Sequence, residues 1–407
     1  MAVFKKTAGN KHYLTGREIK AITKANAKEM KRLEAYKNRK AEESEFLSQM
    51  NNAENILEIE DLHTFFFTEQ GVVKAVNGVS YDVPKNAVVG VVGESGCGKS
   101  VTSMSVMRLI QGPTGQIVDG SIRFKSVDYK LDEKGNPVPK DGCPGEYETE
   151  EKVYDIAKMP IHEIHRIRGK QIAMIFQEPM TSLNPVFTIG EQLDEVTLIH
   201  VPGATKEQAK QKSEEMLRLV GIIPENVYNA FPHELSGGMR QRVMIAMALA
   251  AEPRLIIADE PTTALDVTIQ AQILDLLQDI KNKIDGSILL ITHDLGVIAE
   301  MADYVVVMYA GKVIEKGTVH EIFKDPRHPY TIGLQKSKPT MTLDDSLELY
   351  NIPGNVPNPI NMPNHCYFKE RCAMCTAKCA GDYPGMIQVS PTHFVACHLY
   401  DEEKNNG

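Results

Sequence analysis

A glycine-rich stretch carries the strongest chemical signal in this chain. Its eight residues are Gly93, Glu94, Ser95, Gly96, Cys97, Gly98, Lys99 and Ser100. The apolar run 87–92 precedes it and the apolar segment 101–110 follows, which predicts a buried strand, a tight turn and a helix. In that setting backbone N–H groups can surround phosphate oxygens, Lys99 can reach the β- and γ-phosphates, and the Ser100 hydroxyl can bind Mg²⁺. An ordinary glycine turn is the weaker interpretation, because the flanking pattern is that of a P-loop.

A pair of acidic residues follows another predicted strand. Asp259 and Glu260 come directly after the apolar run 255–258. Beside a P-loop, an acid at the carboxyl end of a strand holds Mg²⁺, usually through water. A second acid next to it can orient and polarise the attacking water, as a general base does. Two carboxylates that merely cap a strand are the alternative, which the P-loop makes minor.

Two further polar residues follow predicted strands. His293 comes after the strand 287–291 and can reach the γ-phosphate from the side opposite Lys99. Gln177 comes after the strand 172–176 and can contact Mg²⁺ or the attacking water. A lone histidine or glutamine is more often structural, so these two residues gain their meaning from the motifs around them.

A second anion-binding element opens a later helix. Ser236, Gly237 and Gly238 follow Leu235 at the start of a helix predicted over 236–251, and helix N-termini attract anions. One chain does not need two sites for one γ-phosphate. We therefore expect this element to serve a nucleotide that another chain holds.

The composition limits the class of protein. The chain has 407 residues and a formal net charge of −9, which gives no support to nucleic acid as its main partner. It has no run of about eighteen apolar residues and no apolar segment at its N-terminus, so we expect neither a membrane span nor a secretory signal. Its seven cysteines fit a reducing compartment. We expect a soluble, intracellular protein.

Strands alternate with helices after the P-loop, which predicts an α/β domain with a mainly parallel sheet. We assign this domain to residues 55–325, with β-rich segments before the P-loop. Turn-forming residues and an acidic run over about 126–159 indicate a surface insertion. From 326 to 407 the chain is rich in Pro, Asn and Cys, which indicates a small appended module.

Residues 1–54 form a basic N-terminal extension. Lys and Arg outnumber Asp and Glu in it, and Ile19, Ile22, Met30 and Leu33 follow a roughly helical spacing. We interpret the extension as helical or disordered. It can be a solvated helix or a basic helix that rests on an acidic lipid surface, and both interpretations stay open.

These motifs, in this order, resemble the ATP-binding subunit of an ABC transporter. The resemblance rests on GESGCGKS, Gln177, LSGG, LIIADEP, Ala264-Leu265-Asp266 and His293. It implies a P-loop ATPase domain with an antiparallel β subdomain and a helical subdomain at about 178–250. It also implies a head-to-tail dimer, in which two ATP molecules lie between the Walker A loop of one chain and the signature motif of the other.

The resemblance further implies a role for each matched residue. Those that bind the nucleotide are the Walker A loop 93–100, Gln177 of the Q-loop, Ser236, Gly237 and Gly238 of the signature motif, and Asp266 of the D-loop. Mg²⁺ is held by Ser100, Gln177 and Asp259, while Glu260 is the catalytic base and His293 the switch histidine. An aromatic residue before the Walker A loop usually stacks on adenine, and Phe66 is our assignment, with Phe65 and Phe67 as close alternatives.

A narrower resemblance covers residues of about 55–400. The stretches that carry it are IFQEPMTSLNP, FPHELSGGMRQR, ADEPTTALDVTIQAQIL, ITHDLGVIAE, VVMYAGKVIEKG and HPYT, which are similar to the oligopeptide/dipeptide/nickel importer group. The residues after the P-loop lysine are more like the first, or D-type, of the two paired ATPases of that group. This implies ATP hydrolysis that powers uptake of oligopeptides or dipeptides, with nickel or another small solute as the alternative.

The same resemblance implies partners and a location. The partners are a second ATPase subunit that forms a heterodimer with this chain, two membrane permease subunits that meet the stretch 177–185, and, indirectly, an extracytoplasmic solute-binding protein. The chain would lie at the cytoplasmic face of the membrane through the permeases. A soluble ABC ATPase of DNA repair or translation is less favoured, because the chain has one Walker loop and no heptad run.

Cysteines gather near the C-terminus. Cys366, Cys372, Cys379 and Cys397 resemble the C-terminal cysteine motif of the family, which in some members holds a [4Fe–4S] cluster. Four thiolates also suit a structural zinc, and free thiols are the third alternative. Cys375 is an additional thiol among them, which makes the assignment of the metal ligands less definite.

Overall fold

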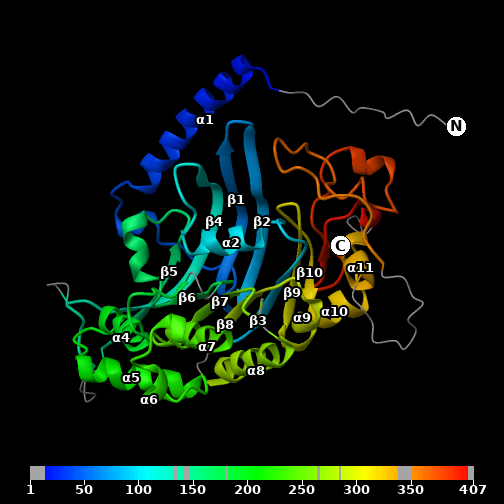
Figure 1. Cartoon of the computed structure of the whole chain (residues 1–407). Helices are drawn as coiled ribbons and strands as arrows, with labels where there is room; N and C mark the ends of the chain where they lie inside the picture. Colours follow the sequence, from blue (N-terminus) through cyan, green and yellow to red (C-terminus); the bar gives the residue numbers. More distant parts are fainter. Residues whose placement is uncertain are drawn as a thin grey trace, which may run out of the picture.

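The computed structural model of the chain describes residues 14–132, 136–140, 147–178, 182–263, 266–283, 286–337 and 350–401. Two sheets organise these residues, a four-stranded antiparallel sheet and an eight-stranded, mainly parallel sheet (Figure 1). Helices surround the larger sheet, and a group of them gathers at one end of the molecule (Figure 1). The α/β class predicted from alternating strands and helices is confirmed.

The larger sheet has a parallel, buried centre. Its strands are β3 (Val88–Val92), β6 (Ile172–Ile175), β7 (Leu255–Asp259), β8 (Ser287–Ile291) and β9 (Tyr304–Tyr309). Their spatial order is β9–β3–β8–β7–β6. A strand that is covered on both faces needs apolar side chains along its whole length, which is why these segments are continuous apolar runs. Parallel pairing brings the carboxyl ends of β3, β6, β7 and β8 to one edge, where the predicted site residues follow.

Three antiparallel strands extend this sheet beyond β9. They are β10 (Lys312–Thr318), β12 (Phe394–Val395) and β11 (Ile387–Gln388), and each pairs with the one before it in that order. The segment 326–407, predicted as an appended module, therefore contributes two strands to the central sheet. A strand of two residues carries too little pattern to be recognised in a sequence, because its long-range partner defines it.

The smaller sheet has the order β2–β1–β4–β5, with β1 at Asn55–Thr68, β2 at Gly71–Pro84, β4 at Gly115–Tyr129 and β5 at Thr149–Asp155. A two-residue turn, Glu69–Gln70, joins β1 to β2, and Gly71 is the first residue of β2, where it pairs with Thr68. The end of β4 and all of β5 come from 126–159, which the sequence predicted as a surface insertion. Within that segment, 133–135 and 141–146 lie outside the described residues.

The helices group around the larger sheet. They are α2 (Lys99–Val106), α4 (Ile189–His200), α5 (Lys206–Leu219), α6 (Pro224–Val227), α7 (Gly237–Leu249), α8 (Val267–Lys283), α9 (Leu295–Met301), α10 (Val319–Lys324) and α11 (Pro329–Lys336). Helices α4 to α7 pack together as a helical subdomain (Figure 1). Thr188 and Thr205 cap α4 and α5, each accepting a hydrogen bond from the backbone N–H three residues further on. None of the helices in the described parts of the chain combines the length and hydropathy needed to cross a bilayer.

The N-terminal extension contains a helix, α1 (Gly16–Lys37). Thr15 and Glu18 form a capping box at its start, which satisfies backbone N–H groups that the first turn leaves unpaired. The helix lies beside the smaller sheet (Figure 1), where Leu33 is buried and the Asn26 side-chain amide donates a hydrogen bond to the Thr68 carbonyl at 2.8 Å. Most of its basic side chains are exposed.

A buried carboxylate ties the C-terminal part to the central sheet. Glu315 of β10 is fully buried, and its oxygens accept hydrogen bonds from the backbone N–H groups of Arg327 and His328 and lie 2.8 Å from His393 Nε2. His328 in turn caps α11, because its Nδ1 accepts the N–H of Tyr330 at 3.0 Å. Complete burial lowers the pKa of His328 from its ordinary 6.5 to about 4.

This burial makes the stability of the C-terminal part depend on pH. As the pH falls from 6.5 to 4, the unfolded His328 binds a proton that the folded one does not, so unfolding becomes easier by up to about 3 kcal/mol. Replacing His328 with Asn keeps a capping acceptor and removes the titration. Urea unfolding at pH 7, 5.5 and 4.5 should show a steeper loss of stability in the parent chain than in His328→Asn. Parallel pH profiles for the two chains would contradict this assignment.

Candidate functional site

The predicted P-loop lies between β3 and α2, and its conformation requires glycine. Gly98 has φ +102°, and a Cβ atom at this position would overlap the carbonyl oxygen of Ala75. The loop backbone curves around the Lys99 side chain, whose Nζ donates hydrogen bonds to the carbonyls of Gly93 at 2.7 Å and Glu94 at 3.2 Å. A lysine held at the centre of a loop of backbone groups is positioned for phosphate.

Ser100 and Asp259 meet at the edge of the parallel sheet. The Ser100 hydroxyl donates a hydrogen bond to Asp259 Oδ1 at 3.0 Å. Burial raises the pKa of the Asp259 carboxyl and the charge of Glu260 raises it further, whereas the Ser100 hydrogen bond lowers it. A hydroxyl, a carboxylate and the nearby Gln177 amide are the oxygen donors that Mg²⁺ prefers. These residues fit the predicted magnesium site.

Glu260 is the centre of a second set of contacts. Its Oε2 accepts hydrogen bonds from Gln177 Nε2 at 3.0 Å and from the Thr263 hydroxyl at 2.9 Å, and its Oε1 lies 3.3 Å from His293 Nδ1. Its backbone has φ +47°, a conformation that non-glycine residues rarely adopt and that clusters at functional sites. The ends of β6, β7 and β8 thus aim three predicted residues at one point. Thr263, which the sequence analysis did not single out, completes the set.

These groups surround one cavity of about 480 Å³. Its lining residues are Ala75, Ser95, Gly96, Gly98, Lys99, Ser100, Val101, Gln177, Glu260 and His293. The cavity therefore brings the loop, the carboxylate and the histidine to one space that polar and charged groups line. A space of this kind can hold a polyphosphate with its metal ion beside a carboxylate able to orient water.

Comparison with known proteins agrees with this geometry. Residues 76–263 match the family model described as "ABC transporter", and residues 314–379 match "Oligopeptide/dipeptide transporter, C-terminal region". The oligopeptide transport ATP-binding protein AppD of Bacillus subtilis (strain 168) is 46% identical over 350 residues, which are 86% of this chain and 98% of that protein. The chain belongs to the ABC transporter ATP-binding proteins. Its resemblance to the oligopeptide and dipeptide branch is confirmed.

Two other relatives support this membership, and one solved structure shares the fold. OppD of the same organism is 49% identical over 346 residues, or 84% of this chain and 88% of OppD, and DppD is 45% identical over 350 residues, or 86% and 96%. They are an oligopeptide and a dipeptide transport ATP-binding protein. The ATP-binding cassette MJ0796, solved as a dimer with ADP and Pi, shares 23% identity and a TM-score of 0.52 over 65% of this chain and 98% of its own. That likeness concerns the fold.

The predicted signature motif lies at a separate, exposed place. Ser236 caps α7, because its hydroxyl accepts the N–H of Met239 at 3.3 Å, and Ser236 and Gly237 are exposed. None of 236–238 lines the cavity described above. Gln241 of the same helix donates a hydrogen bond to the Pro261 carbonyl at 2.6 Å, which links the signature helix to the segment after Glu260.

Two predicted nucleotide contacts stay predictions. Phe66 is half-buried, its ring lies against Gly115, and it is not among the described residues that line the cavity. Asp266 is exposed and caps α8 by accepting the N–H of Ile269 at 3.0 Å. Its predicted D-loop neighbours, Ala264 and Leu265, lie outside the described residues.

The cysteines give no support to the predicted metal. Cys366, Cys372, Cys379 and Cys397 are free thiols, and burial raises the pKa of Cys366 and of Cys397 to about 11. Among the residues that the structure describes, no three His, Cys, Asp or Glu side chains are arranged to hold a metal ion. The predicted iron–sulfur cluster and its zinc alternative therefore remain without structural support in the described part of the chain.

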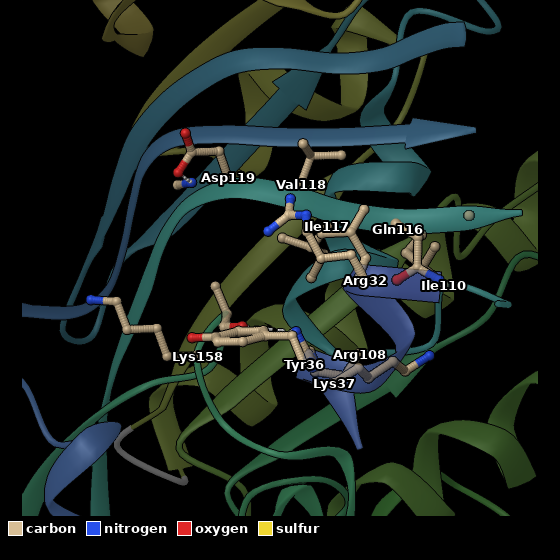
Figure 2. A pocket seen from close by; sticks show the side chains of 14 residues that line it. Arg32, Tyr36, Lys37, Arg108, Ile110, Gln116, Ile117, Val118, Asp119 and Lys158 are labelled. Carbon is tan, nitrogen blue, oxygen red and sulfur yellow. Dashed lines mark hydrogen bonds between the residues drawn. The ribbon is translucent and has the colours of Figure 1, made fainter. Parts of the chain in front are cut away.

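A pocket of about 200 Å³ beside α1 has a different character (Figure 2). Arg32, Lys37, Arg108 and Lys158 contribute cations to it. Arg32, Lys37 and Lys158 pair with carboxylates of Glu29, Glu34 and Asp155, and Arg108 donates to the carbonyls of Ala157 and Met159. Because these charges already have partners and none of the predicted site residues lines it, we assign no ligand to this pocket.

Gly96 and Gly98, two of the P-loop glycines with positive φ, should respond differently to alanine. Gly98→Ala places a Cβ against the Ala75 carbonyl, whereas Gly96, with φ +78°, has nothing within 4 Å of a Cβ. We expect Gly96→Ala to lower the free energy of unfolding by about 1 kcal/mol and Gly98→Ala by about 3 kcal/mol. Urea unfolding of both variants without nucleotide measures the difference. Equal losses would show that the Ala75 contact does not constrain the loop.

Proposed function

We propose that this chain binds MgATP and hydrolyses it to power peptide import through separate membrane subunits. The observation that supports hydrolysis best is the orientation of Glu260 by Gln177, Thr263 and His293 at the mouth of the P-loop cavity. A binding or regulatory subunit without activity does not need a carboxylate held from three sides. The names of the relatives support peptides over nickel.

The residues divide the chemistry among them. Lys99 exchanges its contacts with loop carbonyls for the β- and γ-phosphates, and the loop N–H groups bind the remaining phosphate oxygens. Mg²⁺, held by Ser100, Asp259 and Gln177, neutralises phosphate charge when it is bound. Glu260 accepts a hydrogen bond from the attacking water and draws its proton away, while His293 stabilises charge on the γ-phosphate.

A second ATPase subunit completes each site in this proposal. Ser236 and Gly237 at the N-terminus of α7 are exposed, and neither residue lines the P-loop cavity of this chain. The backbone N–H groups at this helix end are therefore available to an anion that another chain holds. Pairing head to tail with a related subunit would bring this end onto the γ-phosphate held by the other chain. We propose a heterodimer, because the D-type resemblance is to one of two paired ATPases.

Membrane subunits would dock on the helical subdomain. Two exposed apolar side chains, Val186 (71%) and Phe187 (49%), lie between Gln177 and α4 in the sequence. A third, Ile199 (66%), lies on α4 itself. Exposed apolar side chains in one region mark interaction sites. This supports a peripheral position at the cytoplasmic face of the membrane through two permeases, with a solute-binding protein as an indirect partner. Residues 179–181 of the predicted contact stretch lie outside the described residues.

Replacing Glu260 with Gln tests hydrolysis. Glutamine keeps the size and the hydrogen bonds from Gln177 and Thr263 but cannot accept a proton, so turnover should fall by at least about a hundredfold. MgATP affinity should stay within about threefold of the parent value. Phosphate release by the assembled transporter measures turnover, and calorimetry measures affinity.

Glu300→Gln serves as the matched control, because Glu300 is an exposed residue of α9 outside the cavity. It should hydrolyse ATP at the parent rate. Undiminished hydrolysis by Glu260→Gln would remove Glu260 from its catalytic role, and failure of the parent chain to bind MgATP would refute the proposed function itself.

A metal in the cysteine group is a separate proposal. It rests on the resemblance of Cys366, Cys372, Cys379 and Cys397 to the C-terminal cysteine motif of the family, since no three His, Cys, Asp or Glu side chains in the described part of the chain are arranged around a metal site. Anaerobically purified protein should then absorb near 400 nm and contain iron. Zinc without iron would favour a structural zinc site, and absence of both metals would leave free thiols.

A further inference from the structure

Glu94, the second residue of the P-loop, is bound through all of its polar groups. Its backbone N–H donates to the Tyr330 hydroxyl at 2.8 Å, and its carbonyl accepts a hydrogen bond from Lys99 Nζ at 3.2 Å. Its two carboxylate oxygens accept hydrogen bonds from Arg371 at 2.7 and 2.9 Å. Tyr330 and Arg371 belong to the C-terminal part of the chain. Glu94 therefore connects that part to the lysine of the nucleotide site.

Arg371 is itself held in one position. Its side chain is 5% exposed, and its Nε donates to the Pro353 carbonyl at 2.9 Å. Its remaining donors reach the Ile352 carbonyl at 3.4 Å and the Tyr309 hydroxyl at 3.3 Å. A bidentate arginine–carboxylate pair adds geometric specificity to its strength. Backbone carbonyls hold the Arg371 guanidinium in place. We therefore infer that Arg371 determines the position of the Glu94 carboxylate.

The charge of Glu94 also matters for the ligand. A carboxylate next to a loop that receives polyphosphate repels it, and this repulsion is larger where water is partly excluded. Among the described residues, Arg371 forms the only ion pair with Glu94. The pair therefore opposes this repulsion without occupying any backbone N–H group of the loop.

We propose that Arg371 is a positioning residue for nucleotide binding. It neutralises Glu94 and, together with the Tyr330 hydroxyl, fixes the P-loop backbone, so that the C-terminal part of the chain sets the affinity of the loop for ATP. This inference rests on the proposed function, because it requires the loop to bind ATP.

A charge cycle tests the inference with the full-length chain and MgATP in a calorimeter. Arg371→Gln leaves the Glu94 carboxylate without its cation, so MgATP affinity should fall about tenfold, as loss of one charge-assisted contact implies. The double variant Arg371→Gln/Glu94→Gln removes the repelling charge as well. It should bind MgATP at least about threefold more tightly than Arg371→Gln, a partial rescue that damage to the fold would not produce.

Parent-like affinity in Arg371→Gln, or a double variant as weak as the single one, would overturn the inference. Failure of the parent chain itself to bind MgATP would instead refute the proposed function. Both results are readable from the same set of titrations, since each variant is compared with the parent chain.

A pair of tyrosine variants covers the case in which Arg371→Gln does not fold. Tyr330→Phe keeps the ring packed against Tyr309 and Phe368 but removes the acceptor of the Glu94 N–H. MgATP affinity should fall about fivefold, a value within the usual range for one hydrogen bond. Tyr400→Phe is the matched control, because its hydroxyl donates to the Arg327 carbonyl. It should bind like the parent chain, and equal affinities in the two variants would contradict the proposed link.

Discussion

The close approach of three backbone segments at Gly98 is the constraint on which the site depends. The carbonyl of Ala75 in the smaller sheet lies where a Cβ of Gly98 would be. Gly311, in the turn between β9 and β10, donates its N–H to the Cys97 carbonyl and accepts the N–H of Asn77 through its own carbonyl. Both sheets and the P-loop are thus joined by backbone hydrogen bonds at one point. A side chain at Gly98 would separate them, which is why the loop cannot be treated as an independent motif.

The side chains of the site also depend on the parallel strands that end beside this junction. The parallel strands β6, β7 and β8 deliver Gln177, Glu260 and His293 to the same edge at which β3 delivers the loop. Contacts of about 3 Å among three side chains from separate strands require each strand to hold its register. Buried apolar runs hold it, because a slip of one residue would reverse every side chain. The ordinary packing of the sheet therefore supplies the precision of the site.

Sequence reasoning succeeded where neighbours along the chain determine the local environment. The strands predicted at 255–258 and 287–291 agree with β7 and β8 to within one residue, because a buried parallel strand has a continuous apolar pattern. Motif order predicted Asp259, Glu260 and His293 beside the P-loop, and in the structure they lie around the P-loop cavity or at its edge. It could not reveal short strands such as β11 and β12, whose only signal is a distant partner. It also missed Arg371, because nothing near that residue in the sequence indicates that it contacts the P-loop. The contacts predicted for Phe66, Asp266 and 236–238 are with a ligand or a second chain, so the fold of one chain does not test them.

The distance along the chain between Glu94 and Arg371 has a consequence for synthesis. The two residues are 277 positions apart, so at roughly 5–20 residues per second a ribosome adds the arginine roughly 14–55 s after the glutamate. Throughout that interval the nascent P-loop lacks its cation, and the strands β11 and β12 of the central sheet are made later still. The P-loop of a growing chain can reach its final form only after Arg371 has been added, which delays assembly of the loop until most of the central sheet is available.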